Sequence, residues 1–137
     1  MIVFDTQDYE LIQHGELAYA FPLHEQVGTA STAAVLFEVA PHGALATHTD
    51  SAEETLVVLS GECEATVGDE TGLLRAGQVA VVPASVPHAV RNLTDEPLRV
   101  LGIFTSATIL SIFGDDSDSP QLLVNGAPIA TPAAVAA

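Results

Sequence analysis

The sequence predicts an all-β protein, a sandwich or barrel of antiparallel strands in a single domain. Short runs rich in Val, Leu, Ile and Thr recur between turn-forming residues, and helical periodicity is hard to find. The 137 residues fit one compact domain with its own core. Strands that follow one another without intervening helices favour a sandwich or barrel over alternating β and α units.

Each expected strand is a run of apolar and β-branched residues. These runs lie at 31–40, 54–60, 62–68, 78–83, 88–93 and 98–113. Clusters of Gly, Pro, Asn and Asp between them predict turns at 41–43, 60–62, 67–72, 75–78 and 92–97. Apolar side chains of these strands are expected to fill the interior: Leu36, Leu56, Val58, Val79, Val81, Val90, Leu101 and Ile103.

The two ends of the chain differ in composition from its middle. Residues 1–34 are expected to form N-terminal strands or an arm at a dimer interface, and residues 35–113 to form the barrel. Residues 114–137 combine an acidic loop, a hairpin signal and an Ala/Pro-rich tail that we expect to be flexible. The hairpin signal is the Asn-Gly pair at 125–126, and the proline two positions later confines the second arm to a sheet edge.

The charge of the chain excludes several kinds of partner. There are 18 acidic residues and three arginines, and the formal net charge is −15. Such a charge repels polyanions, so we expect neither nucleic acid nor an anionic membrane surface as a partner. The sequence has no lysine, which excludes Schiff-base chemistry on this chain.

Cysteine content and hydropathy predict a cytoplasmic location. Cys63 is the single cysteine, so it cannot form an internal disulfide and is expected to be a small core residue. No apolar run approaches the roughly 18 uncharged residues of a membrane-spanning helix. The N-terminal residues also lack the basic start of a secretory signal.

An unusual group of polar residues directly precedes an apolar run. In a continuous strand, His48, Asp50 and Glu54 point to one face while Glu53 points to the other. Unpaired carboxylates in an apolar interior are costly and repel one another, and a divalent cation removes both problems. His88, flanked by a proline, is expected to add a ligand from a strand that is close in space. Imidazole nitrogen and carboxylate oxygen suit Fe2+, Mn2+, Zn2+, Ni2+ and Cu2+.

Two stretches of the chain resemble the two motifs of the cupin family. The first motif is a Gly, a His-x-His pair, a Glu and a closing Gly, and it is matched by Gly43, His48, Glu54 and Gly61. The second motif is a Gly, a Pro-x-Gly, a His and an Asn, and it is matched by Gly77, Pro83, His88 and Asn92. Asp50 stands where the family has its second histidine, and Ser85 replaces the turn glycine.

This resemblance implies a double-stranded β-helix (jelly-roll) barrel, a homodimer, and metal and substrate held inside the barrel mouth. It implies His48, Asp50, Glu54 and His88 as the metal ligands. Asp50 completes this set, or its side chain is too short to reach the metal and leaves water in that position, or it accepts a proton from a ligand histidine and fixes its tautomer. A set rich in carboxylates favours Fe2+, Mn2+ or Zn2+ over Ni2+ or Cu2+. The alternative is a hydrogen-bonded cluster in a barrel that has lost its metal.

A metal with an open coordination position predicts a small metal-dependent enzyme acting on an oxygen-containing organic molecule. Dioxygenase-like chemistry is our preferred hypothesis, with Glu54 or Asp50 as the catalytic base. The alternatives are a metal-dependent isomerase, cyclase or lyase, and a non-catalytic barrel that binds a small molecule or a sugar. The His-x-Asp at 48–50 also resembles the motif of 2-oxoglutarate oxygenases, with Arg99 where a cosubstrate-binding arginine stands, but the second cupin motif favours the cupin.

Overall fold

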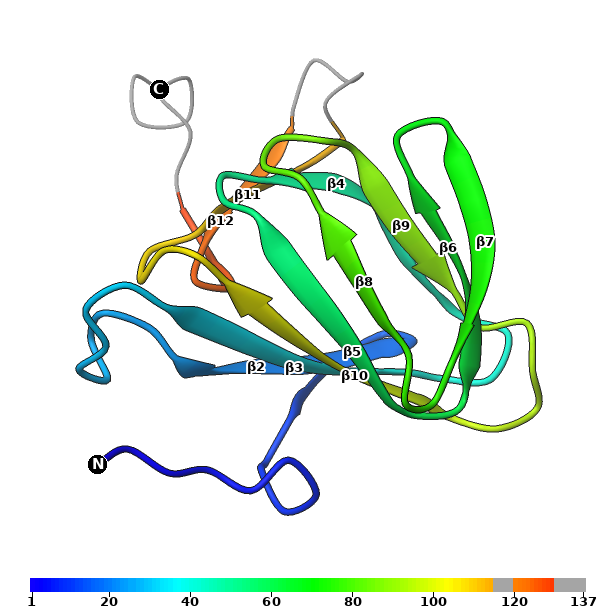
Figure 1. Ribbon diagram of the computed structural model, residues 1–137, viewed down its shortest axis with the longest axis horizontal. Coiled ribbons are helices and arrows are strands. Elements are labelled where there is room, and N and C mark those ends of the chain that lie inside the picture. The colour runs from blue at the N-terminus through cyan, green and yellow to red at the C-terminus, as the bar shows by residue number, and fades with distance from the viewer. Residues whose placement is uncertain (115–119, 130–137) are drawn as a thin grey trace.

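Two antiparallel sheets form the body of the molecule (Figure 1). The computed structural model describes residues 1–114 and 120–129, in which there are strands, turns and loops but no helix. None of these described residues therefore belongs to a helix that could cross a membrane. The predicted all-β fold is confirmed.

Each sheet is built from strands that are distant in sequence. The six-stranded sheet has the order β1 (Ile12–His14), β2 (Leu17–Leu23), β3 (Ala33–Val39), β10 (Leu98–Phe104), β5 (Glu54–Ser60) and β8 (Val79–Val82). The seven-stranded sheet has the order β13 (Ala127–Pro128), β12 (Gln121–Val124), β11 (Leu110–Phe113), β4 (Ala44–Asp50), β9 (His88–Arg91), β6 (Glu62–Val67) and β7 (Glu70–Arg75). From β3 to β11 the chain changes sheet at every step except the β6–β7 hairpin, which is the winding of a jelly roll.

The core lies between the two sheets. Side chains at alternate positions of β5 turn inward, and Leu56 and Val58 are buried there as predicted. The same prediction is wrong for Val79, Val81 and Ile103, whose exposed fractions are 56%, 55% and 40%. They occupy the outward positions of β8 and β10, because apolar character alone does not say which face of a strand meets the core.

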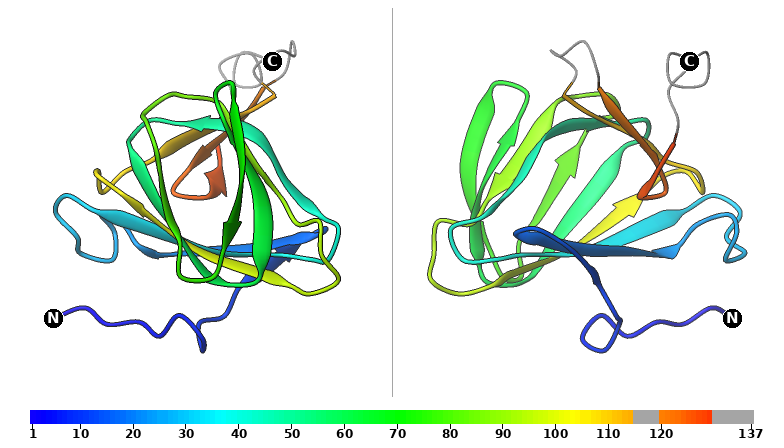
Figure 2. Two further views of the ribbon diagram at one scale, coloured as in Figure 1. Left: turned by 45° about the vertical axis from the view of Figure 1, so that its right-hand side comes forward. Right: turned by 180° about the vertical axis from the view of Figure 1, so that it is seen from behind.

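The N-terminal arm, residues 1–11, crosses the outer face of the six-stranded sheet (Figure 2). The Arg99 guanidinium on β10 donates to the carbonyl of Thr6 in this arm and pairs with Glu38 of β3 at 2.9 Å. Leu36 lies on the same outer face and is nevertheless fully buried. Arg99 is thus directed away from the interior of the barrel.

Two expected segments differ from the structure. Residues 98–113 are not one strand, because β10 and β11 lie in different sheets and the chain bends between them. Ser and Thr occupy this bend, and both are compatible with a strand, so composition did not mark it. The turn expected at 67–72 is only two residues long, because the exposed strand β7 already begins at residue 70.

A hairpin of β12 and β13 forms one edge of the seven-stranded sheet. Its turn residues Asn125 and Gly126 have φ angles of 48° and 81°, both left-handed, as a two-residue type I′ turn requires. The Tyr19 hydroxyl of β2 donates to the Gly126 carbonyl at 2.6 Å and ties the turn to the other sheet. The acidic loop at 115–119 and the tail at 130–137 lie outside the described residues.

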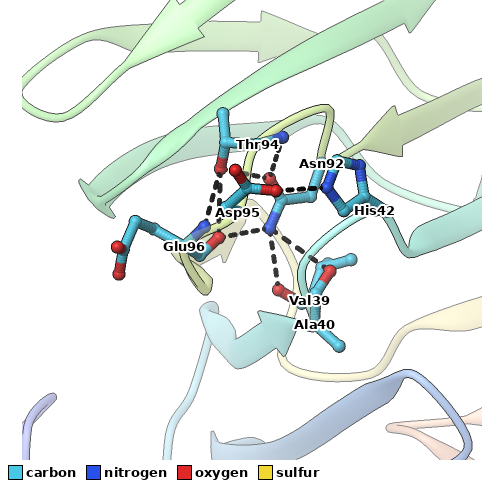
Figure 3. Close-up of polar contacts among 7 residues, drawn as sticks. All are labelled: Val39, Ala40, His42, Asn92, Thr94, Asp95 and Glu96. Atoms are coloured by element: carbon cyan, nitrogen blue, oxygen red, sulfur yellow. Dashed lines mark hydrogen bonds and ion pairs between the residues drawn. The ribbon is translucent and has the colours of Figure 1, made fainter.

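The buried side chain of Asn92 fastens the loop between β9 and β10 to the end of β3 (Figure 3). Its amide nitrogen donates to the carbonyls of Val39, Ala40 and Glu96 at 3.2, 3.3 and 2.7 Å. Its amide oxygen accepts from the backbone nitrogen and the hydroxyl of Thr94. Asn92, the last residue of the second motif, therefore has a structural role.

We expect Gly61→Ala to destabilise the protein more than Gly77→Ala. Both glycines are left-handed, with φ angles of 88° and 89°, so each alanine adds similar backbone strain. A Cβ at position 61 would lie 2.7 Å from the Pro97 carbonyl oxygen, whereas at position 77 nothing lies within 4 Å. Urea denaturation should show a loss in the free energy of unfolding that is larger by at least about 1 kcal/mol for Gly61→Ala. Equal losses would contradict the close approach.

Candidate metal centre

Four ionisable side chains are buried together between the sheets. His48, Asp50, Glu54 and His88 have exposed fractions of 3–6%. His48 on β4 lies directly opposite His88 on β9, and β4 also carries Asp50. Glu54 reaches the same interior from β5 of the opposite sheet.

These residues face a common interior, as predicted, but they do not lie on one continuous strand. A continuous strand was expected from His48 to Glu54, but β4 ends at Asp50 and the chain crosses to the other sheet before Glu54. Both sheets turn their inner faces to the same core, so the three side chains still converge. Glu53 in the crossing is exposed, as expected.

Three of the four residues are close enough to share one ion. His48, Asp50 and His88 each offer a ligand atom, and these atoms all lie within 4.8 Å of one another. Asp50 Oδ2 lies 3.4 Å from His48 Nε2 and 3.1 Å from His88 Nε2. Glu54 lies outside this trio, although its Oε1 is 3.5 Å from His88 Nε2.

Backbone carbonyls orient both imidazole rings. His48 Nδ1 lies 2.8 Å from the Ala46 carbonyl oxygen, and His88 Nδ1 lies 2.9 Å from that of Val86. Because a carbonyl only accepts, each Nδ1 carries the proton it donates, and each Nε2 is directed toward Asp50. His88 Nε2 is buried and has no hydrogen-bond partner among the described residues.

Two further residues hold the cluster, and both were missed in the sequence. Ser111 on β11 lies opposite Asp50, and its hydroxyl donates to Asp50 Oδ1 at 2.6 Å, which leaves Oδ2 for the imidazoles. The ring of Phe113 stacks on that of His48 with a centroid distance of 4.5 Å. Neither has a local sequence signal, because their position depends on the pairing of β11 with β4.

Gly102 on β10 makes room for Glu54. A Cβ at this position would overlap the Glu54 carboxylate and lie 2.9 Å from a methyl group of Val35. An isolated glycine inside a strand often marks such a close approach, so Gly102 within the run 98–104 is a signal that the sequence itself offers.

The ionisable groups strongly perturb one another. Burial alone raises the pKa of Asp50, but its contacts with His48 and His88 and the Ser111 hydrogen bond outweigh this and hold that pKa well below its usual range. Burial raises the pKa of Glu54, and the nearby charge of Asp50 adds to it. Burial lowers the pKa of His88, but the Asp50 and Glu54 carboxylates raise it to about 10. Without a metal the cluster therefore holds an imidazolium beside an ionised Asp50.

The donor set fits a divalent metal ion. Two imidazole nitrogens and a carboxylate oxygen converge, and His88 Nε2 faces the carboxylates of Asp50 and Glu54 without the geometry of a hydrogen bond to either. The structure thus shows that His48, Asp50 and His88 could bind a metal, and it leaves the identity of the ion open.

Other polar residues stay away from the cluster. The His42 imidazole pairs with Asp95 at 2.6 Å on the surface, beside the Asn92 loop (Figure 3). Arg99 contacts Glu38 and the N-terminal arm on the outer face of the barrel. The hypothesis that Arg99 binds a cosubstrate at the site is therefore wrong. Parity along β10 directs it outward, since its neighbours Leu98 and Val100 point into the core.

A pocket with mainly apolar walls adjoins the cluster. Its lining includes the aromatic rings of Tyr19, Phe21, Phe37, Phe104 and Phe113. Leu45 of β4 and Leu123 of β12 line it as well. The polar cluster therefore lines a pocket that lies between the two sheets.

The fold and the site together define a small β-barrel protein that contains a buried cluster of metal-binding residue types. A family model described as "Cupin domain" matches residues 35–104, about half of the chain. The chain belongs to the cupin family. This confirms the resemblance carried by the two sequence motifs.

Comparison with known proteins adds relatives of different function. A Bacillus subtilis protein named H2HPP isomerase is 36% identical over 73 residues, which are 53% of this chain and 31% of that protein. A Lactobacillus farciminis oxalate decarboxylase, solved as a formate complex, has a TM-score of 0.72 and 23% identity over 80% of this chain and 34% of its own. The Cnp3 cupin domain of Schizosaccharomyces pombe has a TM-score of 0.68 and 20% identity, covering 77% of this chain and 74% of its own. The chain thus spans about a third of the isomerase and of the decarboxylase.

We expect Gly102→Ala to cost more stability in the wild-type background than in a Glu54→Ala background, because the added methyl group meets the Glu54 carboxylate. Thermal or urea denaturation of the four proteins of this double-mutant cycle should give a coupling of at least about 1 kcal/mol. The Val35 contact is common to both backgrounds and cancels. Equal losses in the two backgrounds would show that Glu54 does not rest on Gly102.

We expect the affinity for Mn2+ to rise with pH between 6 and 8. Below its pKa of about 10, His88 is protonated in the metal-free protein, so binding must release this proton. Each pH unit then raises the affinity about tenfold. Calorimetry in buffers of different ionisation enthalpy measures both the affinity and the proton released. His42→Ala should keep the slope and His88→Ala should abolish binding, whereas an affinity independent of pH would contradict the assignment.

Proposed function

We propose that the protein is a metal-dependent enzyme that moves a proton on a small organic molecule with a carbonyl or enol oxygen. The observation that carries this proposal is the buried cluster itself, in which the candidate ligand trio lies beside a separate carboxyl group, Glu54, with a raised pKa. The 36% identity to a protein named as an isomerase supports this reaction class.

Different side chains would bind the metal and transfer the proton. His48, His88 and Asp50 would hold the metal, with Asp50 fixed by Ser111. When bound, the ion would act as a Lewis acid on the substrate oxygen. Glu54 is the proton carrier, because burial raises its pKa and it therefore holds a proton more tightly than an exposed glutamate does. The apolar walls exclude water from the reacting atoms.

An Fe2+-dependent dioxygenase is a second candidate. Two histidines and one carboxylate in one cluster are the ligand set of many non-haem Fe2+ oxygenases. This reading uses the same three residues and requires O2 as co-substrate. Glu54 would then be a positioning residue for His88 rather than a proton carrier.

A direct test follows hydrogen–deuterium exchange beside the carbonyl in a panel of 2-oxo acids and 1,3-diketones in D2O. Protein loaded with Mn2+ or Zn2+ should accelerate exchange, and Glu54→Gln should slow it by about 100-fold or more while the metal content stays stoichiometric. Exchange that is no faster than with free metal would contradict the proton-transfer proposal. O2 uptake by the Fe2+-loaded protein with the same compounds would favour the dioxygenase, and unaltered, tightly bound compound would favour a binding protein.

A further inference from the structure

The pocket beside the metal centre is polar in one place only. Its ionisable side chains are those of the cluster, and the remaining lining is apolar apart from Ser111 and Tyr19. Ser111 is engaged with Asp50, and the Tyr19 hydroxyl already donates to the Gly126 carbonyl. A ligand therefore meets polar partners at the cluster and apolar side chains elsewhere.

No cationic side chain outside the cluster is placed to compensate a second negative charge. The whole sequence contains three arginines and no lysine. Arg99 is bound to Glu38 and Thr6 on the outer face, and Arg75 and Arg91 are exposed and absent from the pocket lining. The net charge of −15 makes the surroundings still less favourable for an anion.

The β12–β13 hairpin approaches β2 of the other sheet (Figure 2). It also contributes to the apolar lining of the pocket. A Cβ on Gly126 would lie 2.6 Å from the ring of Phe21 and 2.8 Å from that of Tyr19, so the turn backbone packs directly on both rings. Leu123 of the same hairpin also lines the pocket. This wall can pack against the carbon atoms of a ligand, but the Tyr19 hydroxyl hydrogen is already donated to Gly126.

We propose that the ligand of this pocket carries its metal-binding oxygens at one end and an uncharged apolar body at the other. This inference rests on the proposed function and narrows its substrate class. A ligand with a second, distal carboxylate is rejected, because that group would be buried without a partner. 2-Oxoglutarate, whose second carboxylate lies two methylene groups beyond its 2-oxo acid head, is therefore a poor ligand of this chain.

The test compares two ligands that differ only at the distal end. 5-Methyl-2-oxohexanoate has an isopropyl group where 2-oxoglutarate has its distal carboxylate, and both have the same 2-oxo acid head. Calorimetric titration of the Mn2+-loaded full chain should show the branched acid binding at least about tenfold more tightly. Equal affinities, tighter binding of 2-oxoglutarate, or binding of neither acid to metal-loaded protein would overturn the inference.

A pair of lysine variants separates the pocket from the general charge of the molecule. Leu45→Lys places a cation in the half-buried lining of β4, and Thr47→Lys places the same charge at an exposed position of that strand. Leu45→Lys should tighten the binding of 2-oxoglutarate at least about tenfold. Thr47→Lys should leave the ratio of the affinities for 5-methyl-2-oxohexanoate and 2-oxoglutarate at its wild-type value. The same change in both variants would overturn the inference.

The metal content of each sample keeps the two proposals distinguishable. Protein that retains no stoichiometric metal would end the proposed function, and this inference with it. Stoichiometric metal combined with equal affinities would end only the inference about the ligand.

Discussion

The burial of two carboxyl groups in an otherwise apolar interior governs this structure. Asp50 stays ionised there because two imidazoles and the Ser111 hydroxyl surround it, and Glu54 lacks a comparable set of partners. The same interior thus lowers the pKa of one carboxyl group and raises the pKa of the other. In the proposed function, this separation of pKa values assigns Asp50 to metal binding and Glu54 to proton transfer.

The jelly-roll winding is what brings these groups together. Because the chain changes sheet after β4, Asp50 and Glu54 face each other across the core although only three residues separate them. β11 and β10 then complete the two sides, since Ser111 supports Asp50 and Gly102 leaves room for Glu54. Every residue of the centre is therefore placed by strand pairing rather than by a flexible loop, which suits a site that must hold its geometry.

Much of the centre could be predicted from the sequence, and the remainder depended on register. The alternation of His48 and Asp50 and the spacing to His88 indicated a common interior, and the family match confirmed the fold they implied. Ser111 and the outward direction of Arg99 were not predictable, because a shift of one residue in pairing reverses which face a side chain occupies. Val79 and Val81 show the same limit, since apolar residues also occupy outer faces.

The contact between His88 and Glu54 joins side chains of opposite sheets. A motion that separates the sheets lengthens this contact, so the proton affinity of Glu54 and the local opening of the barrel are thermodynamically linked. A metal or ligand held between β5 and β9 would join the two sheets and oppose their separation. Amide protection in those two strands then becomes a gauge of site occupancy, readable without knowing the reaction.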